Sequence, residues 1–204
     1  MIERRVLKER AREQIKGNIG ILFLCYLIMI AIIGGLAFVP FVGTIGLIFV
    51  EGPFILSMYM IYLAITYGEQ PQVGDVFKGF SENFGTAVLT NLLIGIFTFL
   101  WSLLFVVPGI IKAFSYSMSF YILAENPQMS ATEAITESRR LMDGHKMEYF
   151  VLILSFIPWM LLGTITAGLA YIYVGPYIQV TVANFYQELK RTSMTTIEGS
   201  AENL

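Results

Sequence analysis

The sequence predicts an all-α membrane protein with about six transmembrane helices arranged as three hairpins, together with amphipathic cytoplasmic helices. Three observations indicate this fold class. Hydrophobic residues make up 56% of the 204 positions and charged residues only 14%, against roughly 25% charged in ordinary soluble domains. The apolar residues gather in long runs, which only two polar stretches interrupt, at about 67–84 and 125–148. The basic residues fall at the ends of these runs.

Three uncharged runs are long enough to cross a membrane, because a helix needs about 20 apolar residues to span roughly 30 Å of hydrocarbon. Residues 19–39, 85–107 and 150–174 contain no Asp, Glu, Lys or Arg. A shorter run follows each of them, at 53–67, 109–124 and 176–186. Six crossings are therefore expected. Because the second run of each pair is short, the number of crossings stays between four and six.

Each pair of runs shares a plan in which a proline stands near the start of the second run. These residues are Pro53, Pro108 and Pro176. Proline is tolerated in the first turn of a helix, where its missing amide has no intrahelical partner, so we expect a helix to begin at each one. The plan indicates either a triplicated hairpin or the general need for a turn at the outer end of any membrane hairpin. Both interpretations give one bundle.

The distribution of basic residues predicts the orientation of the chain. With an even number of crossings, 12 of the 13 Lys and Arg residues belong to segments on one side, and only Lys112 is left over. Since Lys and Arg keep loops in the cytoplasm, both termini are expected to be cytoplasmic, in a multipass protein of a bacterial plasma membrane. The first run leads directly into further apolar sequence and is expected to be retained as a span.

Three regions follow from this organisation. Residues 1–17 are predicted to form a basic, moderately amphipathic interfacial helix, residues 18–191 a single transmembrane bundle, and residues 192–204 a flexible polar tail. Within the bundle, residues 130–144 are predicted to form an amphipathic cytoplasmic helix. Ser130 and Glu133 are expected to form a capping box at its start, and Gly144 is expected to end it. The predicted inward face is Ala134, Ile135, Ser138, Leu141 and Met142.

Several sequence blocks together resemble a known family. They are Ala11-Arg12-Glu13-Gln14-Ile15-Lys16-Gly17-Asn18, Pro108-Gly109-Ile110-Ile111-Lys112, Ala124-Glu125-Asn126-Pro127, Gly144-His145-Lys146 and Pro176-Tyr177-Ile178. The chain resembles the bacterial membrane-protein family "domain of unknown function 975" over nearly its whole length. This resemblance implies a multipass plasma-membrane protein without an established activity, and it brings no catalytic or binding residues. More distantly, the central block is similar to the membrane region beside some glycerophosphodiester phosphodiesterase catalytic domains, which this sequence lacks.

Three polar residues in apolar surroundings are the candidate site. Glu51 and Lys112 are expected at a similar outward depth, and with Gln179 they would form an intramembrane polar cluster, because an ionisable group in lipid needs a partner, water or a route to the interface. In the alternative, each snorkels separately to the outer surface. Cys25 is the only cysteine and His145 the only histidine, so the usual zinc ligand sets cannot form. No catalytic, metal-binding or cofactor-binding residues are predicted.

The sequence thus favours a non-enzymatic helper or regulatory membrane module over an enzyme, which would need several convergent polar groups. The alternative is a transporter or binding protein for a small hydrophobic or amphipathic molecule, for which six spans would suffice only in an oligomer. The partners considered are the lipid bilayer, a protein at the cytoplasmic helix and a second copy of the chain. Nothing in the composition indicates a nucleic acid.

Overall fold

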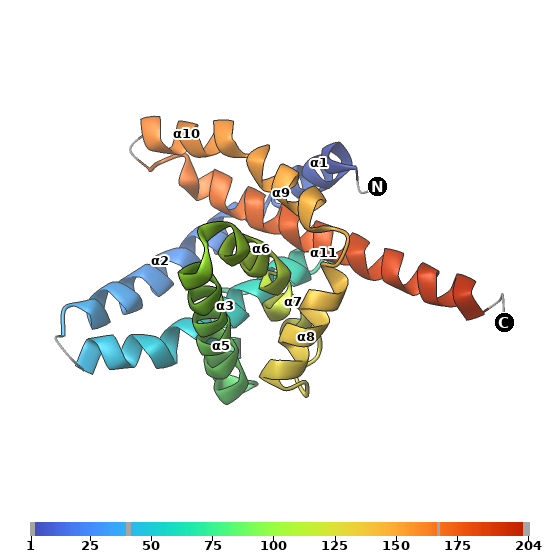
Figure 1. Ribbon diagram of the computed structural model, residues 1–204. Helices are drawn as coiled ribbons and strands as arrows, with labels where there is room; N and C mark the ends of the chain where they lie inside the picture. The colour runs from blue at the N-terminus through green and yellow to red at the C-terminus, as the bar shows by residue number, and fades with distance from the viewer. Residues whose placement is uncertain (1–2, 40–41, 167, 202–204) are drawn as a thin grey trace.

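The computed structural model describes residues 3–39, 42–166 and 168–201, and every regular element in these ranges is helical (Figure 1). The helices are α1 Arg4–Gln14, α2 Ile19–Ala37, α3 Val42–Thr66, η1 Val73–Phe77, α4 Lys78–Ser81, α5 Phe84–Leu104, α6 Val106–Tyr116, α7 Ser119–Glu125, α8 Ala131–Leu141, α9 Lys146–Leu154, α10 Ile157–Ile165 and α11 Tyr171–Ala201. Along the chain, α2 packs on α3, α5 on α6, and α10 on α11.

Five stretches within the described residues are long and apolar enough to cross a membrane. They are Ile19–Ala37, Ile45–Thr66, Phe84–Leu103, Val106–Glu125 and Lys146–Ile165. The second and fourth reach this length because α3 and α6 begin earlier than the sequence indicates, at Val42 and Val106. The last predicted run, 176–186, lies in α11, which does not belong to this set because polar residues follow it closely.

The expectation that helices begin at the three prolines holds for one of them. Pro108 lies in the first turn of α6, whereas Pro53 lies inside α3 and Pro176 inside α11, so both of those predicted starts are wrong. Close packing explains the glycine beside Pro53: a Cβ atom on Gly52 would lie only 2.5 Å from a backbone oxygen of α5. The Ser57 hydroxyl donates to the Pro53 carbonyl (2.9 Å) and accepts from the Gly79 amide (2.8 Å). Gly52 and Pro53 therefore mark a close contact between α3 and α5 and not the start of a helix.

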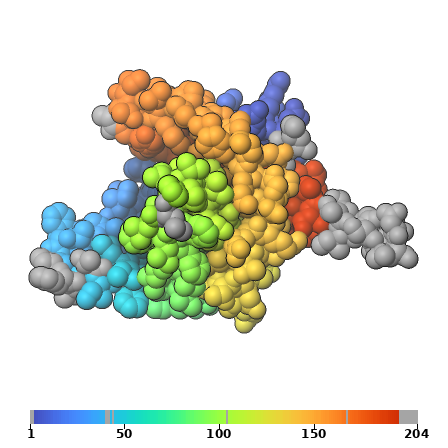
Figure 2. Space-filling view, viewed as in Figure 1, coloured from blue at the N-terminus to red at the C-terminus, as the bar shows by residue number. Residues whose placement is uncertain are grey.

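The second helix of each pair supplies most of the buried core. About half of the spans formed by α3 and by α6–α7 is buried, against roughly a tenth of α2 and α5, and α11 buries most of its residues from 174 to 186. The exposed faces carry large apolar side chains, including Ile30, Phe99, Leu103 and Ile165. In the space-filling view the α2–α3 pair and the α9–α10 segment project as separate lobes (Figure 2). Such extensive apolar exposure fits a lipid environment.

Aromatic rings fill the centre of the bundle. Tyr121 of α7 stacks on Tyr186 of α11 with ring centroids 5.3 Å apart, and Tyr59 of α3 lies 4.3 Å from Tyr121. The Tyr121 hydroxyl donates to the Gln179 carbonyl at 3.1 Å, and the hydroxyls of Tyr26 and Tyr62 hydrogen-bond to each other. Buried tyrosines keep a polar partner while their rings pack. This arrangement joins α3, α7 and α11 into one core.

Helix α8 has the predicted capping and the predicted faces. Ser130 and Glu133 form the capping box, and Gly144 has a φ of +77°, which favours glycine. All five residues of the predicted inward face are buried. The structure adds a function for Ser138: its hydroxyl donates to the Ser115 carbonyl (2.8 Å) and accepts from the Met118 amide (3.1 Å), at the break between α6 and α7. The apolar face of α8 is therefore used inside the protein.

Helix α1 packs into the bundle more closely than the sequence suggests. Leu7, Ala11 and Ile15 are fully buried, and α1 lies along α11. At the other end of the chain, α11 continues as a helix to Ala201, whereas the sequence predicts a flexible tail over 192–204. Residues 202–204 of that prediction lie outside the described residues.

Candidate functional site: a polar junction of α1, α3, α7 and α11

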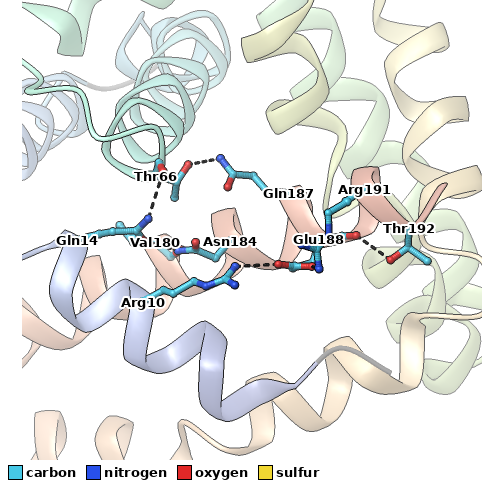
Figure 3. A network of polar contacts seen from close by, with 9 residues as sticks. All are labelled: Arg10, Gln14, Thr66, Val180, Asn184, Gln187, Glu188, Arg191 and Thr192. Carbon is cyan, nitrogen blue, oxygen red and sulfur yellow. Dashed lines mark hydrogen bonds and ion pairs between the residues drawn. The ribbon is translucent and has the colours of Figure 1, made fainter. Parts of the chain in front are cut away.

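The C-terminal ends of α1 and α3 meet the middle of α11 in a network of polar side chains (Figure 3), and the end of α7 joins them through Glu125. We call this network the polar junction. Its members are Arg10, Gln14, Thr66, Tyr67, Glu125, Asn184, Tyr186, Gln187, Glu188 and Lys190. Each of the three helix ends contributes, so the junction joins parts of the chain that are far apart in the sequence.

The backbone at the end of α3 is capped by local hydrogen bonds, and side chains from two distant helices bind its last residue. The amides of Gly68 and Glu69 donate back to the carbonyls of Ile65 and Ala64 at 3.1 and 2.9 Å, which is the Schellman pattern, with Gly68 at a φ of +80°. Side chains from two other helices then bind Thr66. Gln14 of α1 donates to its carbonyl (3.2 Å), and Gln187 of α11 donates to its hydroxyl (2.6 Å).

A second group of contacts holds α1 against α11. The Asn184 amide donates to the Gln14 side-chain oxygen at 2.6 Å. One turn further, Glu188 accepts from Arg10 of α1 (2.8 Å) and from Arg191 of its own helix (2.6 Å). Gln14 therefore bridges α3 and α11, since its amide donates to one helix while its oxygen accepts from the other (Figure 3).

Glu125, the last residue of α7, is the acceptor on the other side of α11. Its carboxylate accepts hydrogen bonds from the Tyr67 hydroxyl, from the Tyr186 hydroxyl at 2.8 Å and from the Lys190 ammonium group. Only 14% of the Glu125 side chain is exposed, so these donors replace water around most of the charge. Hydrogen bonds to an ionised group are among the stronger ones in proteins.

The chemistry of these groups suits structure better than proton transfer. Burial, and then the hydrogen bond to Glu125, raise the pKa of Tyr67 to about 12. The phenol therefore stays protonated at neutral pH and acts as a donor. Three donors share the Glu125 carboxylate, so most of its acceptor capacity is used within the protein.

An open groove lies beside Glu125. It has a volume of about 520 Å³. Its charged walls come from Glu69, Lys78, Glu82, Glu125 and Lys190. Lys78 pairs with Asp75 at 3.1 Å and Lys190 pairs with Glu125, so both cations of this groove have a carboxylate partner within the protein.

The structure gives the three residues of the predicted polar cluster different partners. Glu51 accepts a hydrogen bond from Asn91 of α5 at 3.3 Å, and the Lys112 ammonium group lies 4.5 Å from the centroid of the Trp101 ring. Gln179 contributes its backbone carbonyl to Tyr121. No hydrogen bond or ion pair joins these three described residues to one another. Crosslinking between cysteines at positions 51 and 112 is the direct test of the predicted cluster.

The sequence analysis did not identify the polar junction. A signal was present: Asn184, Gln187, Glu188 and Arg191 follow the i, i+3, i+4, i+7 spacing of one helix face. Their partners could not be predicted from the sequence, because Gln14 and Glu125 lie in segments whose positions relative to α11 are set only by folding. Within the described residues, no group of three or more His, Cys, Asp and Glu side chains could hold a metal ion.

A comparison with known families shows to which family the chain belongs. A sequence-family model described as "Protein of unknown function (DUF975)" matches residues 1–115 and 104–193. The chain belongs to this family. No curated protein and no solved structure matches it. Membership confirms the predicted family, whereas the distant resemblance to the membrane region of glycerophosphodiester phosphodiesterases stays a prediction. The family description gives no activity, so any function must be argued from the residues.

Proposed function

We propose that this protein is a non-enzymatic, multipass membrane module whose cytoplasmic side is organised by the polar junction. The observation that carries the proposal is the pairing within the junction: three donors share the Glu125 carboxylate, and hydrogen bonds join Gln14 to Thr66 and Asn184, and Gln187 to Thr66. Buried polar networks of this kind fix a unique arrangement of helices. A catalytic site would instead leave a nucleophile or a base open to a substrate.

The membrane arrangement forms part of the same proposal. Five helices are long and apolar enough to cross, and the N-terminal part of α11, which includes the buried core residues Val174, Tyr177 and Val180, supplies the sixth crossing. Three helical hairpins then place both termini and α8 in the cytoplasm, in agreement with the distribution of Lys and Arg. The polar junction would lie at the cytoplasmic boundary of the bilayer, where its charged members meet water.

The charged face of α8 is the surface that we propose for a protein partner. Its apolar face is occupied by α5, α6 and α7, while Glu133, Thr136, Arg139 and Arg140 point outward and are exposed. The groove on this side, about 660 Å³ in volume, is lined by Glu133 and Glu137 among others. The charged residues that line this groove are Glu133 and Glu137, so a partner segment with positive charge fits the groove.

Site-specific photo-crosslinking in cells tests this function. A photoreactive residue at Thr136, on the exposed face of α8, is expected to give one discrete protein adduct, and the same residue at Phe99, on the apolar face of α5, is expected to give none. Reversing the charges of Glu133 and Glu137 should abolish the adduct while the protein remains in the membrane. Equal labelling from both positions, or an adduct that survives charge reversal, would contradict the proposal.

A second candidate function, binding of an amphipathic molecule, is favoured by one observation. An apolar groove of about 330 Å³ lies between α6 and α9, with Lys146 among its lining residues. Its other lining residues are Val107, Ile110, Ile111, Phe114, Met147 and Phe150. Widening it with Phe150→Ala, or closing it with Ile111→Trp, should change the retention of a fluorescent fatty acid in opposite directions. Unchanged retention in both variants would exclude this site.

A further inference from the structure

A basic stripe on α1 faces a groove formed with α10 and α11. The groove has a volume of about 740 Å³. Arg4, Lys8 and Arg12 stand at i, i+4 and i+8, so they follow one face of the helix. Across the groove, Ser155, Trp159 and Tyr177 form the opposite wall.

Among the residues that the structure describes, no carboxylate pairs with any of the three cations of this stripe. Of the acidic residues in the groove, Glu9 is bound to Arg5 at 2.8 Å, and Glu3 forms no ion pair in the described part of the chain. The lining, which consists of four basic and two acidic side chains plus neutral residues, has a formal charge of +2. Like charges at i and i+4 destabilise a helix, so a bound anion would relieve a repulsion that the protein leaves unbalanced.

Lys8 is the central residue of the stripe and is half-buried. Its ammonium group donates to the Ser155 carbonyl at 2.9 Å and lies 4.1 Å from the centroid of the Phe156 ring. Burial lowers its pKa, and the neighbouring charges of Arg4 and Arg12 lower it further. A carbonyl oxygen and a ring face are weak counterparts for a full charge, so Lys8 retains donor capacity directed at the groove.

The groove borders an exposed apolar surface. Ser155 and Phe156 form the break between α9 and α10, halfway along the apolar stretch Lys146–Ile165. Beyond the break, α10 exposes Ile157, Leu161 and other apolar side chains. Cations beside an apolar span are costly unless they find an anion or water, and the rings of Trp159 and Tyr177 in the groove wall are of the kind that pack beside lipid headgroups.

We propose that this groove binds the phosphate group of an anionic phospholipid. Arg4, Lys8 and Arg12 contact the phosphate, and the acyl chains lie along the exposed apolar face of α10. The inference rests on the proposed membrane placement but adds a specific ligand class. Phosphate oxygens match the fork of arginine and the point charge of lysine, while the adjoining apolar surface favours a lipid over a free phosphate.

Native mass spectrometry of the full-length protein in neutral detergent tests the proposal. Wild-type protein is expected to retain added phosphatidylglycerol and not phosphatidylcholine, and millimolar inorganic phosphate should not displace the lipid. The triple variant Arg4→Gln, Lys8→Gln, Arg12→Gln should lose phosphatidylglycerol affinity on the order of 100-fold, because each basic residue contributes about fivefold and the three factors multiply. Displacement by inorganic phosphate would show a site for the free ion and overturn the proposal.

Two further variants keep the result independent of folding. Glu3→Gln removes a negative charge from the groove and should raise the affinity for phosphatidylglycerol roughly fivefold, an effect that misfolding cannot imitate. The charge-retaining pair Arg4→Lys and Arg12→Lys should keep most of the binding. If Glu3→Gln leaves the affinity unchanged, the groove is not the binding site.

A matched control separates the groove from overall charge. The triple variant Lys16→Gln, Lys78→Gln, Arg139→Gln removes three positive charges elsewhere and should leave lipid retention within about twofold of wild type. An equal loss in this variant would mean that attraction is general, and would overturn the proposal. Carbonate extraction of cell membranes reports membrane placement by itself, so a failure of lipid selectivity can be told from a failure of the proposed function.

Discussion

The role of Glu125 as a clamp can be tested by a single isosteric change. Glu125→Gln keeps the shape of the side chain but removes the charge that three donors share. A hydrogen bond to a charged group contributes about 1.5–3 kcal/mol, and breaking a fully buried pair costs about 3–5 kcal/mol. Because 31% of the Lys190 side chain is exposed and can return to water, we expect Glu125→Gln to cost about 2–3 kcal/mol.

Thermal unfolding of the detergent-solubilised protein measures this effect. For a protein of this size, 1 kcal/mol shifts the midpoint by about 2–4 °C, so Glu125→Gln should lower it by about 4–12 °C. A double-mutant cycle with Lys190→Met isolates the pair, with an expected coupling of about 1–2 kcal/mol. Glu137→Gln, which breaks an exposed pair with Arg140, serves as the control and should cost less than about 1 kcal/mol.

A loss below about 0.5 kcal/mol for Glu125→Gln, together with no coupling to Lys190, would refute the reasoning. That result would mean that water replaces the donors without penalty. The polar junction could then no longer be regarded as the element that fixes α3, α7 and α11 relative to one another.

Three further predictions concern packing, capping and ionisation. Gly52→Ala should destabilise the protein by about 1–3 kcal/mol in thermal unfolding, since the added Cβ meets the α5 backbone, whereas Gly95→Ala, in open space on α5, should be neutral or stabilising. Ser138→Ala leaves one buried amide and one carbonyl without a partner and should cost about 1–3 kcal/mol, seen as faster hydrogen exchange at the break between α6 and α7. Tyr67 should ionise near pH 12 in ultraviolet titration. Because its pKa is raised, its contribution to stability is complete below the unfolded value of about 10 and is lost as pH rises toward 12, a loss that Tyr67→Phe should abolish.

Local patterns in the sequence determined much of the secondary structure. Apolar runs gave the positions of the long helices, and the capping box at Ser130 with the glycine at 144 placed α8 and its buried face correctly. These signals act between residues that are one or two turns apart, so they survive in any tertiary arrangement.

The prolines show where local patterns were insufficient. Pro53 was expected to begin a helix, but the fit of Gly52 against α5 allows α3 to continue through it. The cluster of Glu51, Lys112 and Gln179 stays a prediction, and the neighbours of Glu51 and Lys112 in the structure, Asn91 and Trp101, depend on how α5 packs on α3 and α6.

The sequence alone established a helical, membrane-compatible chain with a basic first helix, because composition and periodicity are properties of the chain itself. Only the tertiary structure decided which polar groups meet. Asn184 binds Gln14 across 170 residues, and Arg10 binds Glu188 across 178. The polar junction and the basic groove of α1 both result from such long-range contacts, whose partners are selected when the helices pack and bury their shared faces.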